Sequence, residues 1–148
     1  MNRITKLLLS LIALACPFAV AAADDPIELR QQMMEEVGEG AKAIGGMLKG
    51  EQEFDAALVM ESLEVWRRSA AEFGKLFPVG SETGSDTEAR MTIWTDREGF
   101  EAILVDFAGD VDAAIVASPQ DLDALQVVAE PAFKNCKKCH EEYRVEEE

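Results

Sequence analysis

The chain has 148 residues with 14 basic and 29 acidic side chains, which give a formal net charge of −15 at pH 7. This excess of negative charge argues against nucleic acid and anionic membrane surfaces as binding partners, because both would repel it. The length is sufficient for one domain with its own hydrophobic core and too short for two domains of ordinary size.

Residues 1–23 have the pattern of a cleavable secretory signal peptide. Arg3 and Lys6 form a short basic start, residues 7–20 form an apolar run, and residues 21–23 form a small-residue cleavage site. A membrane anchor is the main alternative, but the apolar run is shorter than the roughly 20 residues that a spanning helix needs. The sequence therefore predicts export to the periplasm, without membrane insertion after cleavage.

The mature chain is predicted to be one domain over residues 24–148, with 12 basic against 29 acidic residues and a formal charge of −17. A lipoprotein site that ends at Cys16 is a poor match, because Ala13 stands where a larger aliphatic residue is usual. After cleavage only Cys136 and Cys139 remain as cysteines, in a compartment that permits cysteine chemistry.

Apolar residues recur at helical spacing in four segments, and no alternation typical of strands is present, so the sequence predicts an all-α fold. The first helix is predicted over residues 27–48, with Gly50 as a plausible stop. The second helix is predicted to begin near Asp55, which is a good N-cap, and to end before Pro78.

The longest connection is predicted over residues 77–94, which are rich in Gly, Ser and Thr. A third helix is predicted from a capping box at residues 95–98, and a fourth from Ser118 followed by Pro119. Pro131 lies inside the fourth helix and predicts a kink just before it. Four helices of about 20 residues with mostly short links are typical of an antiparallel four-helix bundle.

Cys136, Cys139 and His140 have the C-x-x-C-H spacing that attaches haem c. With about 100° per helical residue, Cys139 lies about 60° to one side of Cys136 and His140 about 40° to the other, so all three share one face. The thiols can then form thioethers with one macrocycle while the imidazole binds its iron. A disulfide or thiol-redox role does not need His140, and a closed zinc site usually takes four ligands where the mature chain offers three.

The chain resembles the class II c-type cytochromes, the cytochrome c-prime family with its low-spin Met-ligated relatives. The resemblance is carried by LRQQMM in the first helix, LFPVGS and TEARMTIW around the long connection, and CKKCHEEYR near the end. It implies an antiparallel four-helix bundle with one covalent haem inside. It also implies Met34 as the distal residue, Arg30 as the arginine that reaches a propionate, and Arg144 as the proximal-side arginine. On physical grounds alone, each arginine would more often be a solvated helix-face residue.

Met34 also lies on a helical stripe whose small residues leave room for a flat ring, whereas Met33 points about 100° away. The stripe consists of Ile27, Met34, Gly38, Ala41, Gly45 and Leu48. If the Met34 sulfur binds iron, the centre is six-coordinate, low-spin and suited to electron transfer. If Met34 only packs over the iron, the centre is five-coordinate and open to NO or CO. An ordinary core methionine is the third alternative.

The sequence predicts a haem protein that carries single electrons to and from redox proteins and is not an enzyme, because its only histidine is assigned to iron. Binding of NO or CO, for detoxification or sensing, is the alternative function. Lys134, Lys137 and Lys138 form a basic island that would steer an acidic redox partner, unless they are only a solvated lysine face. The resemblance also implies a homodimer through the first two helices.

Overall fold

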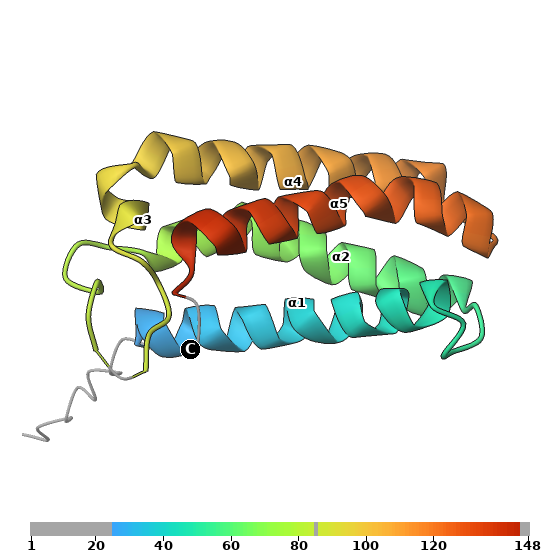
Figure 1. Ribbon diagram of the computed structural model, residues 1–148, viewed down its shortest axis with the longest axis horizontal. Coiled ribbons are helices and arrows are strands. Elements are labelled where there is room, and N and C mark those ends of the chain that lie inside the picture. The colour runs from blue at the N-terminus through green and yellow to red at the C-terminus, as the bar shows by residue number, and fades with distance from the viewer. Residues whose placement is uncertain (1–24, 85, 146–148) are drawn as a thin grey trace, which may run out of the picture.

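The computed structural model describes residues 25–84 and 86–145, so the predicted signal peptide lies outside the described residues. Four long helices alternate in direction along the chain (Figure 1), and the predicted all-α antiparallel four-helix bundle is confirmed. They are α1 (Pro26–Leu48), α2 (Ala56–Glu72), α4 (Arg97–Ala117) and α5 (Leu122–Tyr143). The connection between α2 and α4 contains the 3-10 turn η1 (Phe73–Leu76) and the one-turn helix α3 (Thr92–Thr95). In the described ranges no helix is both long and apolar enough to cross a bilayer.

The helices pack in chain order, with α1 against α2, α2 against α4 and α4 against α5. The approach of α1 to α2 depends on Gly40, where a Cβ atom would lie 3.0 Å from Trp66 Nε1 and 3.1 Å from Ser62 Cβ. The indole Nε1 donates a hydrogen bond of 3.0 Å to the Val37 carbonyl oxygen, which ties the two helices together. α1 and α5 make fewer contacts with each other, and Figure 1 shows them on the same open side of the bundle.

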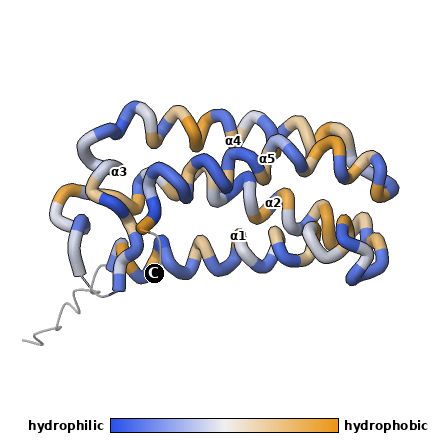
Figure 2. The backbone as a smooth tube through the Cα atoms, in the orientation of Figure 1, coloured by the Kyte–Doolittle hydropathy of each residue, from blue (hydrophilic) through white to orange (hydrophobic). Residues whose placement is uncertain are grey.

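The hydrophobic core consists of two separate clusters. The larger cluster contains Trp66, Phe107 and Leu125 and joins all four long helices. The smaller cluster contains Phe73 and Phe100 and lies at the end of the bundle that carries the long connection. Figure 2 shows hydrophobic and hydrophilic residues alternating along every long helix, as expected when one face of each helix is buried.

Helix starts in the first half of the chain agree with the sequence. Asp25 caps α1 by accepting a hydrogen bond of 2.8 Å from the Ile27 backbone nitrogen. Asp55 caps α2 as predicted, with its carboxylate accepting from the backbone nitrogens of Ala57 and Leu58. These contacts satisfy backbone donors that have no partner within the first helical turn.

The third helix begins one residue later than its predicted capping box. Thr95 ends the short helix α3, and Asp96 caps α4 by accepting from the Gly99 backbone nitrogen at 3.2 Å. The capping-box pattern is present in the sequence, but its first residue, Thr95, belongs to α3 and cannot cap α4.

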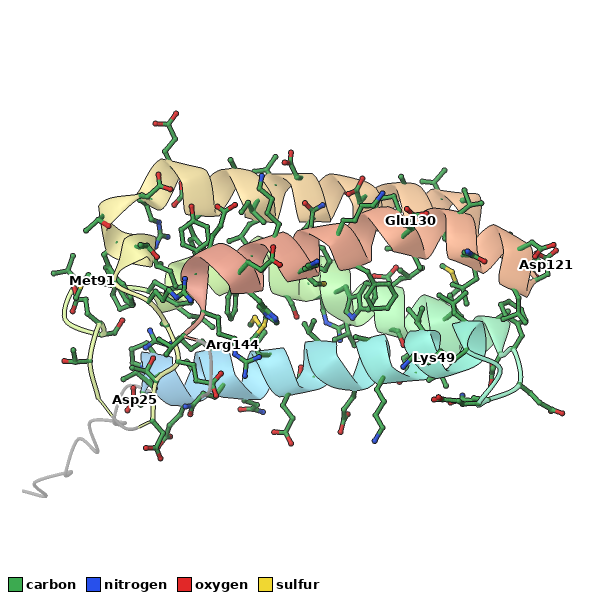
Figure 3. The ribbon with its side chains drawn as sticks, in the orientation of Figure 1. Asp25, Lys49, Met91, Asp121, Glu130 and Arg144 are labelled. Atoms are coloured by element: carbon green, nitrogen blue, oxygen red, sulfur yellow. The ribbon has the colours of Figure 1, made fainter. Side chains whose placement is uncertain are left out.

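The predicted start of the fourth helix is wrong. Ser118 has a left-handed φ of 44° and ends α4, while Asp121 caps α5 through a hydrogen bond of 2.8 Å from the Ala124 nitrogen. Figure 3 shows Asp121 at the start of α5. Pro119 is fully buried, so the Ser-Pro pair belongs to a turn that closes the bundle rather than to a helix start.

α5 continues through Pro131 without interruption. Proline lacks the N–H that would bond the carbonyl of Val127, four residues earlier. Val127 is 73% exposed, so water can replace the missing donor there. The proline is therefore tolerated in the helix that carries the C-x-x-C-H motif.

Candidate functional site

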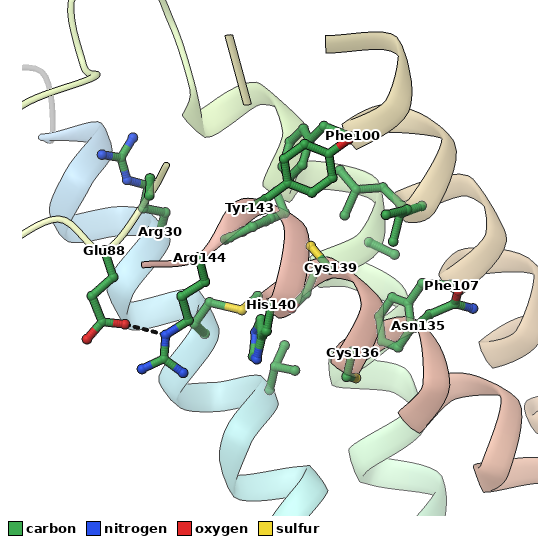
Figure 4. A pocket seen from close by; sticks show the side chains of 18 of the residues that line it. Arg30, Glu88, Phe100, Phe107, Asn135, Cys136, Cys139, His140, Tyr143 and Arg144 are labelled. Carbon is green, nitrogen blue, oxygen red and sulfur yellow. Dashed lines mark hydrogen bonds and ion pairs between the residues drawn. The ribbon is translucent and has the colours of Figure 1, made fainter. Parts of the chain in front are cut away.

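A cavity of about 550 Å³ lies between α1 and α5 and extends into the bundle. This volume is within the range of about 300–1,000 Å³ that is typical of ligand sites. Its inner wall is mostly apolar and is formed by Phe73, Phe100, Ile103, Phe107 and Phe133. Figure 4 shows side chains from several helices around this space.

Cys136, Cys139 and His140 all line this cavity from α5, as their predicted common helical face requires. The two cysteines are free thiols. Cys136 packs against the larger core cluster and Cys139 against the smaller one, so the motif spans the place where the core divides. A flat apolar group attached there would join the two clusters.

Partial burial shifts the pKa values of the three motif side chains, although His140 as a whole residue is exposed. It raises the pKa of the Cys136 thiol and, together with the nearby Cys136, raises the pKa of Cys139 to about 11. Burial also lowers the pKa of His140, with a further lowering by Arg144 that Glu88 opposes. His140 is therefore held as a neutral imidazole at pH 7, the form that can bind a metal.

Met34 lies on the α1 wall of the cavity, half-buried, and packs against both core clusters. Met33 packs only against the smaller cluster and does not line the cavity. Gly38 and Ala41 continue the cavity wall, as the predicted stripe required. Gly45 was also predicted to leave room for the ring, but it does not line the cavity.

Arg30 is buried, with 4% of its surface exposed, and its guanidinium also lines the cavity. It donates hydrogen bonds to the Ser81 carbonyl at 2.9 Å and to Thr87 Oγ1 at 2.6 Å, and its guanidinium carbon lies 4.9 Å from the centre of the Phe77 ring. These partners are neutral, and burial lowers the pKa of the guanidinium. Arg30 therefore anchors the long connection to α1, and its predicted contact with a propionate stays a prediction.

Arg144 follows α5 directly and lies at the edge of the cavity. Its Nε forms an ion pair with the Glu88 carboxylate, which also lines the cavity (Figure 4). Both side chains are more than 40% exposed, so this pair contributes little to stability. Its predicted role as the proximal-side arginine stays a prediction.

The basic island on α5 is partly neutralised. Lys134 pairs with Glu130 at 2.8 Å, and Lys137 pairs with Glu141 at 3.6 Å. Lys138 makes no ion pair with any residue that the structure describes. The positive charge available to a partner protein is therefore smaller than the sequence suggested.

Sequence reasoning missed the hydrogen bond that supports Tyr143. The Tyr143 hydroxyl donates a hydrogen bond of 2.7 Å to Asp96 Oδ2, and its ring contacts Phe100 edge-on at 5.3 Å between centroids. A Cβ atom at Gly99 would lie 2.6 Å from the Tyr143 hydroxyl oxygen, so the glycine is needed for this contact. Asp96 is 47 residues away from Tyr143, and no local pattern links them.

Comparisons with known proteins identify the family. The family model described as Cytochrome C' matches residues 25–144. Cytochrome c' of Rhodopseudomonas palustris is 36% identical over 134 residues, covering 90% of each chain, and cytochrome c-556 of Agrobacterium fabrum is 35% identical over 130 residues, covering 88% of this chain and 87% of the other. The solved structure of the R. palustris cytochrome c' matches with a TM-score of 0.81 and 33% identity, covering 85% of this chain and 100% of that one. The chain therefore belongs to the cytochrome c' family.

Proposed function

We propose that this protein carries single electrons by means of one haem c held in the cavity between α1 and α5. The observation that carries the proposal is the convergence of Cys136, Cys139 and His140 on an apolar cavity whose opposite wall contains Met34. When bound, haem supplies a one-electron iron couple. The two cysteines would hold it through thioethers, and His140 would be its proximal ligand.

The cavity residues fit such a group in chemistry as well as in position. Aromatic and aliphatic walls would contact the faces of an apolar macrocycle, and the polar residues that line the rest of the cavity would accommodate its charged edge. Arg30 is a buried cation whose hydrogen-bond partners are neutral and whose charge is balanced only in part by nearby Asp25, so an anionic group at the cavity edge would add a favourable opposite charge. The neutral imidazole of His140 leaves a ring nitrogen free for a metal.

Binding of NO or CO is the second candidate function. It is supported by Gly38 and Ala41, whose small side chains line the cavity next to Met34 and leave space for a diatomic ligand. In this alternative Met34 covers the iron without bonding it. The chain's only histidine is assigned to the proximal side, so we propose no substrate-converting role for either candidate.

The first test is the covalent attachment itself. Intact-mass spectrometry of the exported protein should show one added haem and a chain that begins after residue 23, and cell fractionation should recover it from the periplasm. A mass without added haem would overturn the whole proposal. Sedimentation of the same sample tests the predicted homodimer.

The second test compares two adjacent methionines. If Met34 binds iron, the absorption spectrum of the parent protein is low-spin with a sulfur-to-iron charge-transfer band, and Met34→Ala converts it to high-spin. Met33→Ala is the matched control and should leave the spectrum unchanged, because Met33 does not line the cavity. A high-spin parent spectrum that shifts on addition of CO would favour gas binding instead.

A further inference from the structure

The carbonyl groups at the end of α5 accept hydrogen bonds from residues that are distant in the sequence. The last four carbonyls of a helix have no intrahelical partner and are commonly satisfied by water or by a local turn. In α5 the Arg144 amide closes the last ordinary helical bond, to His140 O at 3.1 Å, and each of the next three carbonyls accepts a hydrogen bond from a distant part of the chain. These bonds run from Arg90 Nη1 to Glu141 O (3.0 Å), Thr92 Oγ1 to Glu142 O (3.1 Å) and Arg90 N to Tyr143 O (2.9 Å).

All three of these bonds come from one segment, residues 87–92, which we call the strap. The strap precedes the end of α5 by about 50 residues in the sequence. It is also joined to the residues after α5, since the Val145 nitrogen donates to the Glu88 carbonyl at 2.7 Å. At its other end Thr87 Oγ1 accepts a hydrogen bond of 2.6 Å from Arg30 on α1. The strap therefore connects the two helices that border the cavity.

We propose that Arg90 and Thr92 are positioning residues for His140. Their hydrogen bonds hold the last turn of α5, which contains His140, in helical geometry and so fix the height and angle of the imidazole at the cavity. The proposal rests on the proposed function, in which His140 is the proximal ligand. Neither Arg90 nor Thr92 lines the cavity, so both act through the helix end rather than by contact with a cofactor.

The physical reason lies in the weakness of terminal helical turns. The final turn of a helix frays readily because its carbonyls lack partners, and local opening there costs little free energy. Arg90 supplies a charged donor, which is stronger than a neutral one, and places a cation at the negative end of the helix dipole. Loss of one such bond typically changes a local equilibrium by about tenfold.

The two residues allow closely matched variants. Thr92→Val removes the hydroxyl donor at nearly constant shape, and Thr92→Ser restores the hydroxyl. Arg90→Gln removes the guanidinium donor while the backbone bond to Tyr143 remains. Arg67→Gln is the control for loss of an arginine, because Arg67 makes only an exposed ion pair with Glu64 on α2.

The experiment uses the complete exported protein, after mass spectrometry has shown that haem is covalently attached. A failure of this proposal can then be distinguished from a failure of the proposed function. The reduced protein is mixed with NO, and electron paramagnetic resonance follows the rate at which the six-coordinate nitrosyl loses its histidine. We expect about tenfold faster loss in Thr92→Val and Arg90→Gln, and parent behaviour in Thr92→Ser and Arg67→Gln. Urea midpoints of the same variants separate this effect from a general loss of stability.

Two results would overturn the proposal. The first is an unchanged rate of histidine loss in both Thr92→Val and Arg90→Gln. The second is a fall in the urea midpoints of both variants so large that the bundle no longer folds. The strap would then be needed for the fold as a whole and not for the last turn of α5 alone. Hydrogen exchange at the Arg144 amide, which donates to His140 O, should show the same tenfold pattern without use of the iron.

Discussion

One added methyl group at Gly99 tests how the start of α4 and the end of α5 are joined. The Gly99 nitrogen donates to Asp96 Oδ1 at 3.2 Å, and the second oxygen of that carboxylate accepts from the Tyr143 hydroxyl at 2.7 Å. A Cβ atom at residue 99 would lie 2.6 Å from the Tyr143 oxygen and closer still to Asp96 Oδ2. Gly99→Ala must therefore displace the carboxylate and break both hydrogen bonds.

The expected loss follows from these contacts. Loss of an N-cap costs about 1 kcal/mol, and loss of a hydrogen bond to a charged acceptor costs about 1.5 kcal/mol. Alanine regains somewhat less than about 1 kcal/mol over glycine in a helix. Gly99→Ala should therefore lower the free energy of unfolding by about 2 kcal/mol. On a Tyr143→Phe background the bond to Tyr143 is already absent, so the loss of the cap is nearly offset by the helix propensity of alanine and the same change should cost little.

Urea unfolding of the haem-containing protein, followed by far-ultraviolet circular dichroism, measures this difference. With a dependence of about 2 kcal/mol per molar urea, the midpoint should fall by about 1 M. Gly109→Ala is the matched control on the same helix, because a Cβ atom there would meet no other atom within 4 Å. That control should raise the midpoint by roughly 0.4 M through helix propensity alone. Equal, stabilising shifts for the two variants would refute the reasoning.

Three further predictions concern Tyr143, the basic island and Gly40. Burial and its hydrogen bond raise the pKa of Tyr143, the chain's only tyrosine, to about 12. Its stabilising effect should therefore be complete below about pH 10 and be lost as the pH rises through the folded value, and an ultraviolet titration with a midpoint near 10 would contradict this. Lys138→Gln should slow oxidation of the reduced protein by ferricyanide about threefold at low salt. Lys137→Gln should slow it less, because Lys137 is already paired with Glu141, and high salt should remove both effects. Oxidation rates that do not depend on salt would argue against a steering role of the basic island. Gly40→Val should lower the urea midpoint by about 1 M, because its side chain would overlap Trp66; an unchanged midpoint would show that α1 and α2 can separate without cost.

The sequence predicted the parts of this structure that depend on local spacing. Four amphipathic helices and the common face of Cys136, Cys139 and His140 follow from a period of 3.6 residues, and the structure has both. Asp55 was identified as a cap because no competing signal precedes it. Ser118 was misassigned because a Ser-Pro pair and a following aspartate both resemble caps, and only burial of the proline, which is a tertiary contact, decides between them.

The contacts that support the site could not be predicted in this way. Arg30 looked like either a solvated arginine or a propionate ligand. Its burial against a loop more than 50 residues away contradicts the solvated alternative, and the propionate contact stays a prediction. The hydrogen bonds from Arg90 and Thr92 to the end of α5 span a similar separation. Residues this far apart meet only when the bundle closes, so no periodicity within one helix can show them. Met34 was identified, while its role remains a prediction.

The role of Met34 depends on the distance between two helices rather than on the identity of the residue. Met34 belongs to α1 and His140 to α5, and the cavity separates them. A metal–ligand bond tolerates only about 0.2 Å of displacement. That spacing is set by remote contacts: Gly40 determines how closely α1 approaches α2, and the strap joins α1 to the end of α5. A chain can therefore keep both candidate ligands and still change between a six-coordinate and a five-coordinate centre through substitutions that touch neither of them.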